Sequence, residues 1–371
     1  MVAVLLAALA AAVPAHPCRA SLPNGPALPA PIVLRTSCGG FLLAPSGRVT
    51  RLPRHWFARH GGGTGRRWGA QLNLRRNSAG AYFLLRHGHL VWRSHDLYPN
   101  DGGAVAFGPQ RFAFAAYRRG VFLTDLRGPE HLVLGGRSLE PYDFDDAGRL
   151  IVSGQHSLAL VGIDGKTIRR FRFRTRNGFG YDEGSDTLYF VTPTGVLASA
   201  RDTRLRLLRP LARVDGWLTV AQPNLLVFSA ARSITVTRRD GSVVARTRWK
   251  ARHVGSDAGV AVSADGRAFA FRLSDAGPGS RSGTATVYVL RAGATNATAV
   301  YRHRLGLSGC GSGAGLGWNR RSLLYSSSDG RLAVIDTRTG HAIELTPLTR
   351  KLPHRSAGEQ VYAGWRSEFP P

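Results

Sequence analysis

Short runs of alternating hydrophobic and polar residues recur along this chain, and tight turns join them in pairs. The pattern is clearest in SLALVGIDGKTIRRFRF, SITVTRRDGSVVARTRW and RLAVIDTRTGHAIELTPL. Their turns hold Asp164-Gly165, Asp240-Gly241 and Thr339-Gly340, and such residues tolerate the positive φ that two-residue hairpin turns require. The pattern therefore predicts antiparallel hairpins along most of the chain.

These hairpins recur roughly every 35–45 residues, a spacing typical of propeller blades. A second strand pair leads each unit, as in GAVAFGPQRFAFAAY, PYDFDDAGRLIVS, GFGYDEGSDTLYFV, GWLTVAQPNLLVFSA, AGVAVSADGRAFAF and AGLGWNRRSLLYSSS. A repeat of this length that contains only strands predicts an all-β fold, a β-propeller of four-stranded blades. One further unit, at 68–98, has a poorly marked last strand.

The two ends of the chain resemble parts of one blade. PIVLRTSCGGFLLAPSGRVTRLP offers three strands, and QVYAGWRSE near the C-terminus resembles the leading strand of the last full unit. We expect the C-terminal strand to complete the N-terminal blade and close the ring, because closure removes the exposed sheet edges. This gives eight blades, or seven if the unit at 68–98 is not a blade.

The N-terminus differs in composition from the rest of the chain. MVAVLLAALAAAVPA is apolar and ends in small residues suited to signal-peptidase cleavage, although no Lys or Arg precedes it. We expect a signal peptide at 1–15, a Pro-rich leader at 16–30 and a single propeller domain at 31–371. The alternative is a buried apolar N-terminal segment. The mature chain is expected to be a secreted or extracytoplasmic monomer without a transmembrane segment.

Three cysteines remain after cleavage at Ala15. A Cys38–Cys310 disulfide would link the first blade to the loop that enters the last full one, and Cys18–Cys38 is the competing pair. Cleavage after Ala20 would remove Cys18 and leave only the first pairing. No cysteine and histidine spacing indicates a metal site.

The chain carries 50 Lys and Arg against 23 Asp and Glu, a formal net charge of +27. A surface this basic attracts polyanions at low salt. We expect a protein partner or an anionic envelope polymer or lipid head group; nucleic acid is not expected, because no zinc-finger spacing, RRM motif or basic helix occurs. The alternative is diffuse solvated charge with no dedicated partner.

One turn carries a resemblance to a known family. Ser263-Ala264-Asp265-Gly266, followed by RAFAF and later TVYVL, resembles the S-P-D-G turn and flanking strands of the PD40 repeats in TolB-like, WD40-like propellers, with Ala264 in place of the usual proline. The resemblance implies a secreted bacterial propeller that binds a protein or ligand on one face of its ring.

Candidate binding residues lie in the loops that lead into the first strand of each unit, and these loops are expected to meet at one mouth of the central channel. Arg side chains supply forked donors and aromatic rings supply stacking faces for an anionic or sugar-like ligand. The alternative is that the aromatics wedge between blades and the acids shape turns. The candidates are His60, Arg66, Arg67, Trp68, His95, Asp96, Tyr98, Asp101, Glu140, Tyr142, Arg176, Asn177, Asp215, Trp217 and His253.

Two further motifs allow a functional or a structural interpretation. The stretch from Gly61 to Arg67 is a flexible anion-binding loop or a plain insertion, since no GK[ST] ending or following helix makes it a phosphate loop. The acids of DFDDAG and YDEGSD faintly resemble calcium loops but lack the full spacing. We expect ordinary turn acids there, with no metal and no cofactor.

Two functions from different classes remain. The first is an exported binding or scaffold module that uses the loop-rich mouth and is not an enzyme. The second is a propeller lyase or hydrolase acting on a polar anionic substrate, with His60, His95 or His253 as acid or base. No local catalytic motif occurs, and the catalytic residues are unassigned.

Overall fold

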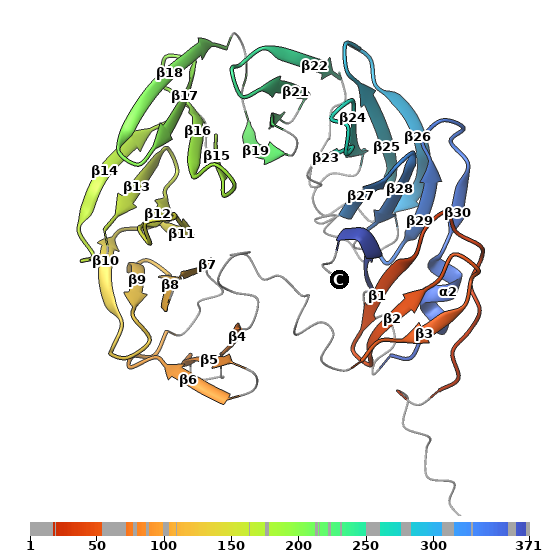
Figure 1. Cartoon of the computed structure of the whole chain (residues 1–371), viewed down its shortest axis with the longest axis horizontal. Coiled ribbons are helices and arrows are strands. Elements are labelled where there is room, and N and C mark those ends of the chain that lie inside the picture. Colours follow the sequence, from red (N-terminus) through yellow and green to blue (C-terminus); the bar gives the residue numbers. More distant parts are fainter. Residues whose placement is uncertain are drawn as a thin grey trace, which may run out of the picture.

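The computed structural model describes most of the chain, and all structural statements below concern that part. The described residues are 18, 20–53, 72–76, 80–86, 89–98, 104–108, 110–162, 164–174, 178–211, 214, 216–221, 224–230, 232–249, 260–275, 283–305, 315–327, 329–354 and 361–368. Within them the strands form eight antiparallel sheets, seven with four strands and one with three. The sheets follow one another around a ring, as Figure 1 shows. The predicted eight-bladed propeller is confirmed.

We number the blades in chain order. The first four blades contain the following strands: blade 1, β31 (Tyr362–Trp365), β1 (Ile32–Thr36), β2 (Gly39–Leu43) and β3 (Val49–Arg51); blade 2, β4 (Leu72–Arg76), β5 (Tyr82–Arg86) and β6 (His89–Arg93); blade 3, β7 (Val105–Gly108), β8 (Arg111–Ala116), β9 (Gly120–Thr124) and β10 (His131–Gly135); blade 4, β11 (Glu140–Phe144), β12 (Leu150–Ser153), β13 (Ser157–Val161) and β14 (Thr167–Arg172).

The other four blades follow: blade 5, β15 (Phe179–Asp182), β16 (Thr187–Val191), β17 (Val196–Arg201) and β18 (Arg204–Pro210); blade 6, β19 (Trp217–Ala221), β20 (Leu225–Ala230), β21 (Ser233–Arg238) and β22 (Val243–Arg248); blade 7, β23 (Ala261–Val262), β24 (Ala268–Ser274), β25 (Gly283–Arg291) and β26 (Thr298–Leu305); blade 8, β27 (Gly315–Asn319), β28 (Ser322–Ser326), β29 (Leu332–Asp336) and β30 (Ala342–Glu344). A short helix α2 (Thr346–Lys351) and a 3-10 turn η2 (Arg366–Glu368) complete the elements.

The C-terminal strand completes the N-terminal blade, as the sequence predicted. β31 pairs with β1 in antiparallel register, with Ile32 opposite Trp365 and Arg35 opposite Tyr362. Trp365 is fully buried and donates its indole N–H to the carbonyl of Gly317 in blade 8 at 2.9 Å. The two ends of the chain are therefore joined within one sheet.

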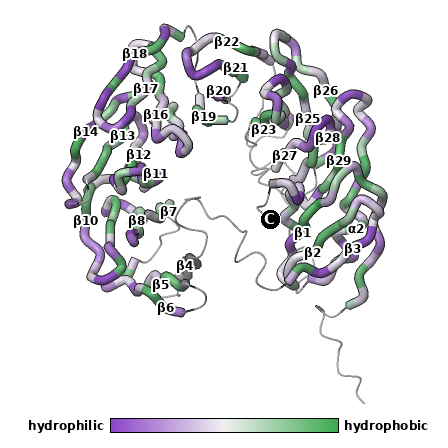
Figure 2. Tube along the Cα trace, in the orientation of Figure 1, coloured by the Kyte–Doolittle hydropathy of each residue, from purple (hydrophilic) through white to green (hydrophobic). Residues whose placement is uncertain are grey.

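The core lies between blades. The inner strands are hydrophobic and buried along most of their length (Figure 2), as in β9 and β12, so each sheet presents apolar side chains on both of its faces. Seven clusters of buried residues in the described part each join two neighbouring blades. The boundary between blades 1 and 2 is not among them, and residues 54–71, which connect these blades, lie outside the described residues.

The predicted hairpin turns have the backbone geometry that their glycines suggested. Gly165, Gly241 and Gly340 have φ of +78°, +85° and +74°. Gly241 also packs closely, since a Cβ atom there would lie 3.0 Å from the Cβ of Arg209 on β18. The turn of blade 6 therefore sits against the outermost strand of blade 5, which explains why a residue without a side chain stands at this position.

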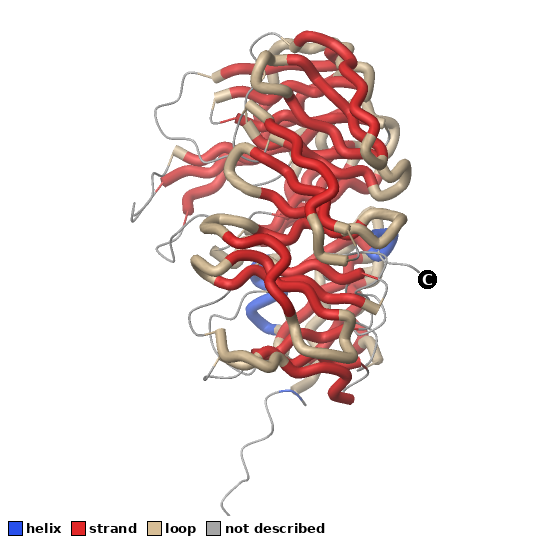
Figure 3. The backbone as a smooth tube through the Cα atoms, turned by 90° about the vertical axis from the view of Figure 1, so that its left-hand side faces the viewer, coloured by secondary structure: helices blue, strands red, loops and turns tan. Residues whose placement is uncertain are grey.

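The strand order defines two ends of the ring, visible edge-on in Figure 3. At the inlet face the chain enters the innermost strand of each blade, as at Glu140 of β11 and Trp217 of β19. At the turn face lie the turns between the first two and the last two strands of each four-stranded blade. Contacts between turns of different blades, such as Asp146 N–H to Asp186 Oδ1 at 3.3 Å, show that these turns share one face.

The disulfide joins Cys18 and Cys38, so the expected Cys38–Cys310 clasp was wrong and the competing pair forms. The reason is the path of the leader, which folds back along blade 1. The Gly25 N–H donates to the carbonyl of Gly47 at 2.8 Å, and the Leu28 N–H donates to the carbonyl of Pro45 at 2.9 Å. This path brings Cys18 to the β1–β2 turn, with Cα atoms 5.0 Å apart. Cys310 and the proposed signal peptide, residues 1–15, lie outside the described residues.

Candidate functional site

Nine of the predicted binding residues lie outside the described residues, so their placement stays a prediction. They are His60, Arg66, Arg67, Trp68, Asp101, Arg176, Asn177, Asp215 and His253. The possible anion loop from Gly61 to Arg67 falls in the same category. The structure therefore bears on six of the fifteen candidates, which occupy two different ends of the ring.

Glu140, Tyr142 and Trp217 lie at the inlet face, where the sequence places them. Glu140 begins β11 and is exposed, and Trp217 begins β19 with 64% of its surface exposed. Tyr142 is 42% exposed, and its ring packs edge-on against Phe179 of blade 5 at 4.8 Å. Tyr142 therefore also wedges between blades, whereas Trp217 leaves its ring open at the inlet face.

His95, Asp96 and Tyr98 lie instead at the turn face, which differs from the expected mouth. Within the described residues blade 2 has three strands, and the chain leaves its third strand at the opposite end from a four-stranded blade. The carboxylate of Glu130, in the β9–β10 turn of blade 3, accepts the N–H groups of His95 and Asp96 at 3.0 Å and the Tyr98 hydroxyl at 2.8 Å. This network joins blades 2 and 3.

The electrostatics of this network indicate a structural role. Burial alone raises the pKa of Glu130, but the N–H groups of His95 and Asp96 outweigh it and hold the pKa below its usual value. Burial and the neighbouring carboxylate raise the pKa of Tyr98, so its hydroxyl stays protonated. The His95 hydrogen bond uses the main chain, and its imidazole donates to no carboxylate of the described residues.

The acids of DFDDAG and YDEGSD also lie at the turn face, in contacts between blades. Arg149 donates to Asp145 at 2.6 Å within blade 4 and to Asp202 of blade 5 at 2.5 Å. Asp182 of blade 5, with 3% of its side chain exposed, pairs with Arg239 of blade 6 at 2.6 Å. These carboxylates are engaged by arginine and serve the packing of successive blades, as expected for turn acids.

A set of arginines on the outermost strands of four successive blades forms the clearest charged surface of the described residues. We call it the arginine band; its strands are β14, β18, β22 and β26, which lie on the outside of the ring in Figure 1. These strands contain no Asp or Glu. The arginines of the band are Arg169, Arg170, Arg172, Arg204, Arg206, Arg209, Arg246, Arg248, Arg302 and Arg304.

Most of the band faces solvent without a counter-charge. Eight of its arginines are exposed, and none of the eight forms a side-chain hydrogen bond or ion pair with a described residue, although Arg209 lies near enough to Asp240 to help lower the pKa of that carboxyl. The eight are Arg170, Arg172, Arg204, Arg206, Arg209, Arg248, Arg302 and Arg304. By contrast, Arg149 and Arg239 at the turn face are paired with acids. The positive field of the band is therefore largely uncompensated.

The four outer strands form a connected surface because each blade contacts the next. The guanidinium of Arg169 on β14 donates to the carbonyl of Thr203 beside β18. Gly241 of blade 6 packs on Arg209 of β18, and Gly293 N–H of blade 7 donates to Val244 of β22 at 2.9 Å. At least one contact therefore bridges each of the three blade boundaries that the band crosses.

Two physical roles are open to such a band. Charged residues on outer strands prevent edge-to-edge aggregation, and charges of either sign achieve this. Ile168 (47% exposed) and Leu207 (62%) lie between the arginines and expose aliphatic surface, which the neighbouring charges would keep from aggregating. Edge protection does not explain why every charge on these four strands is an arginine. A one-signed field over several blades is the arrangement that attracts and holds an extended polyanion.

Sequence reasoning missed the band and the exposed ring of Tyr362 on β31, 66% exposed. The signal for the band was present in RRFRF, RLRLLRP and RTRW, where arginine recurs at strand spacing in the last strand of several units. Across the described residues, no group of three metal-binding side chains occurs, and no helix is long and apolar enough to cross a bilayer.

Comparisons with known proteins give distant structural similarities. No protein-family model and no curated protein matches the chain. Among solved structures, it is similar to BamB from Moraxella catarrhalis, with 14% identity over 73% of this chain and 80% of that chain and a TM-score of 0.45. It is also similar to the computationally designed Ika8 protein, with 13% identity, 80% and 93% coverage and a TM-score of 0.46.

A third similar structure is the β-propeller domain of Cps50 (Swd1) from Myceliophteria thermophila, with 13% identity, 72% and 93% coverage and a TM-score of 0.41. These similarities are too distant to support an argument about function. The strand order and pairing of the chain itself establish its fold, an eight-bladed β-propeller whose N-terminal blade is completed by the C-terminal strand.

Proposed function

We propose that this protein is a binding module for an extended polyanion, which lies along the arginine band of blades 4 to 7. The observation that carries the proposal is the set of eight exposed arginines with no described side-chain partner, on strands without acids. Arg presents a forked, permanently charged donor that suits carboxylate and phosphate groups. The exposed aliphatic residues between the arginines add apolar contact area.

The proposal includes export. It rests on the apolar segment 1–15 and on the predicted cleavage site after Ala15. A polyanion of the cell envelope, such as an acidic polysaccharide or wall polymer, is then the natural ligand. The N-terminal sequence of protein recovered from outside the cytoplasm tests this part, and an uncleaved N-terminus or purely cytoplasmic protein would contradict it.

The inlet face supplies a second candidate site for the same class of function. Trp217 exposes a large ring there, and Glu140 and Tyr142 lie on an innermost strand two blades away. An exposed aromatic ring at a channel mouth suits a protein or sugar contact. The enzymatic alternative depends on His60 and His253, outside the described residues, and we do not propose it.

The test compares polyanion binding of two triple variants. In the first, Arg204, Arg206 and Arg209 of β18 become Gln; in the control, the exposed turn arginines Arg127, Arg320 and Arg338 become Gln. Both variants lose three charges. Binding of polygalacturonate and of polyphosphate is measured by calorimetry between about 50 and about 200 mM salt, a range over which counterion release is strong.

We expect the band variant to bind both polymers about tenfold more weakly at low salt and to show a flatter salt dependence, while the control stays near the parent protein. Equal losses in the two variants would show that net charge, and not the band, attracts the polymer. Failure of the parent protein to bind either polymer at the lowest salt would overturn the proposal.

A further inference from the structure

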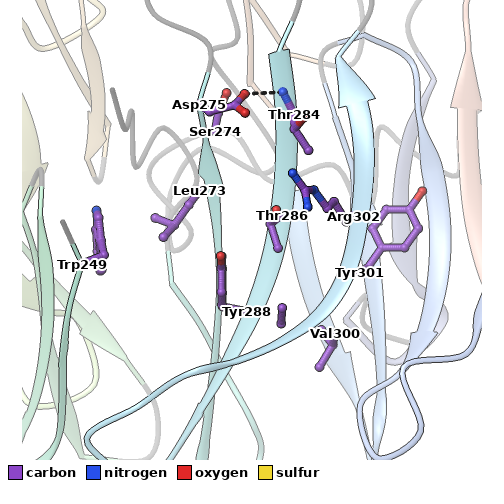
Figure 4. Close-up of a pocket in the computed structure, with 11 residues that line it drawn as sticks. Trp249, Leu273, Ser274, Asp275, Thr284, Thr286, Tyr288, Val300, Tyr301 and Arg302 are labelled. Atoms are coloured by element: carbon purple, nitrogen blue, oxygen red, sulfur yellow. Dashed lines mark hydrogen bonds between the residues drawn. The ribbon is translucent and has the colours of Figure 1, made fainter. Parts of the chain in front are cut away.

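A pocket of about 550 Å³ lies between blades 6 and 7, at the inlet end of the long strands of blade 7. Its volume falls in the range of small-ligand sites. Eleven residues line it, from β24, β25, β26 and the residues directly after β22 and β24, and Figure 4 shows them. The pocket exists because β24, β25 and β26 are seven, nine and eight residues long and extend past the blade 6 strand beside them, which ends at Arg248.

Aromatic rings form one wall. Trp249 of blade 6 stacks on Phe271 with ring centroids 5.7 Å apart, and Phe271 stacks on Tyr288 at the same separation. Phe271 is buried, whereas Trp249 and Tyr288 are partly exposed and line the pocket. Ordered rings with exposed area are the surfaces on which apolar faces of a ligand pack.

Polar groups line the pocket beside the rings. Strand alternation places Thr284 and Thr286 on the same face as Tyr288, and Arg302 pairs with Thr286 across the β25–β26 ladder. In Figure 4 the guanidinium of Arg302 lies beside Thr286, below Asp275 and Thr284. Arg302 is exposed and has no side-chain partner among the described residues. Asp275 receives the N–H of Thr284 on one carboxylate oxygen.

Arg302, Asp275 and the two threonines together favour a sugar acid over a phosphate or sulfate. A phosphate or sulfate would pair with Arg302 but would be repelled by the carboxylate of Asp275, which lines the same pocket. A sugar acid avoids the conflict, because its carboxylate pairs with Arg302 and its hydroxyls donate to Asp275 and exchange hydrogen bonds with the threonines. Its ring packs on Trp249 or Tyr288.

We infer that this pocket binds one uronic acid residue of an acidic polysaccharide. The inference rests on the proposed function, because Arg302 belongs to the arginine band, and it narrows the polyanion to a carbohydrate. The pocket binds one residue of the polysaccharide, and the other arginines of the band bind the carboxylates of the flanking sugar residues. Specificity then comes from the pocket, and long-range attraction comes from the band.

The experiment measures binding of hexasaccharides of α-1,4-galacturonate, β-1,4-mannuronate and hyaluronan, with neutral maltohexaose and polyphosphate for comparison. Three variants alter the pocket: Arg302→Gln, Thr286→Val and Trp249→Leu. The matched control is Arg338→Gln, which removes the same charge from the exposed β29–β30 turn of blade 8, outside the arginine band. Thermal melting of each variant identifies any change in folding.

We expect at least one uronic acid oligosaccharide to bind the parent protein about tenfold more tightly than it binds Arg302→Gln or Thr286→Val, with Arg338→Gln close to the parent. Polyphosphate binding should respond to Arg302→Gln no more strongly than to Arg172→Gln, which alters a band arginine outside the pocket. Binding by Trp249→Leu is interpreted only if its melting temperature equals that of the parent. Arg302→Gln and Thr286→Val leave the ring stack intact, so they test the pocket without it.

The outcomes separate the inference from the function on which it rests. If uronic acid binding falls in the β18 triple variant but not in the pocket variants, the proposed function stands and the pocket inference is overturned. If the pocket variants weaken polyphosphate binding as strongly as they weaken oligosaccharide binding, the assignment of the pocket to a sugar acid is wrong. If the hexasaccharides bind through the pocket while long polyanions show no dependence on β18, the proposed function fails and the pocket remains.

Discussion

The carboxylate of Glu130 accepts the backbone N–H of His95 at 3.0 Å, across the boundary between blades 3 and 2. Blade 2 has three strands in the described part of the chain, one fewer than each of the other blades. The same carboxylate also binds the Asp96 N–H and the Tyr98 hydroxyl. One acidic side chain thereby fixes the segment with which the chain leaves the smallest blade.

The first prediction concerns this carboxylate. Glu130→Gln should lower the free energy of unfolding by about 1.5–3 kcal/mol at neutral pH, the range for hydrogen bonds to a charged group. The pKa of Glu130 lies below its usual value, so its stabilisation is present above the unfolded pKa and is lost as pH falls through the folded pKa. The stability gap between parent and variant should therefore close in acid.

Urea unfolding at pH 7 and at pH 3 measures that gap. Glu140→Gln serves as the control, since Glu140 is exposed and makes no side-chain hydrogen bond within the described residues. A gap of the same size at both pH values would mean that the charge of Glu130 contributes nothing.

The second prediction concerns the buried histidine between blades 7 and 8. His303 is 6% exposed, its Nε2 lies 2.8 Å from the Tyr325 hydroxyl and its Nδ1 lies 2.9 Å from the carbonyl of Arg304. Burial lowers the pKa of His303, and the cations of Arg331 and Arg272 act in the same direction. The unfolded chain therefore binds a proton that the folded chain resists.

The sign of the pH dependence follows. Stability should fall as pH drops below about 6.5, the pKa of an unperturbed histidine, and should level off below the folded pKa. His303→Gln should flatten this part of the profile, whereas His341→Gln, at an exposed position, should leave it unchanged. Melting temperatures between pH 5 and pH 8 would show the difference, and parallel profiles for all three proteins would refute it.

The third prediction concerns the ion pair between blades 5 and 6. Arg239→Ala leaves Asp182 buried without its guanidinium partner, 2.6 Å away in the parent. The loss should be about 3 kcal/mol, at the lower end for buried pairs, because Arg239 is itself partly exposed. Arg238→Ala removes the exposed neighbouring arginine and should change stability by less than about 0.5 kcal/mol. Equal effects of the two substitutions in urea unfolding would contradict the assignment.

The fourth prediction concerns the thiols. With Cys18 and Cys38 joined, one of the three cysteines remains, and thiol titration of the unfolded, unreduced protein should find a single free thiol at Cys310. The pairing also requires that cleavage precede Cys18, as the predicted site after Ala15 does, and that site gives a mature chain that begins at His16. Peptide mapping without reduction checks both points. Recovery of a peptide that joins Cys38 to Cys310 would overturn them.

Replacing Cys18 and Cys38 by serine should cost about 2–4 kcal/mol of stability, the usual contribution of a disulfide that closes a loop of about this size. The loss reflects the leader, which packs on blade 1 only while the disulfide holds its start near the β1–β2 turn. Proteolysis should then cut the leader of the variant first, and an unchanged cleavage pattern would argue that the backbone contacts alone hold it.

The sequence by itself determined the features that arise within one blade. Alternation and turn residues such as Gly165 and Gly241 predicted the hairpins, because strand pairing there is set by neighbours a few residues apart. The completion of blade 1 by the C-terminal strand was also predictable, since YAGW carries the pattern of a leading strand and the N-terminal segment offers only three strands. Tertiary structure decided whatever depends on the placement of separate units.

The strand count of blade 2 moved His95 and Asp96 to the turn face, and the return path of the leader gave Cys38 a different partner. Arg172 and Arg302 belong to one surface only because the ring turns the outer strand of each blade outward. Local pairing energies act over a few residues and leave their trace in the sequence pattern. RRFRF and RTRW show that arginine recurs on single strands, but the sequence pattern does not show that these strands share one surface, since nothing in the extended chain brings their side chains together.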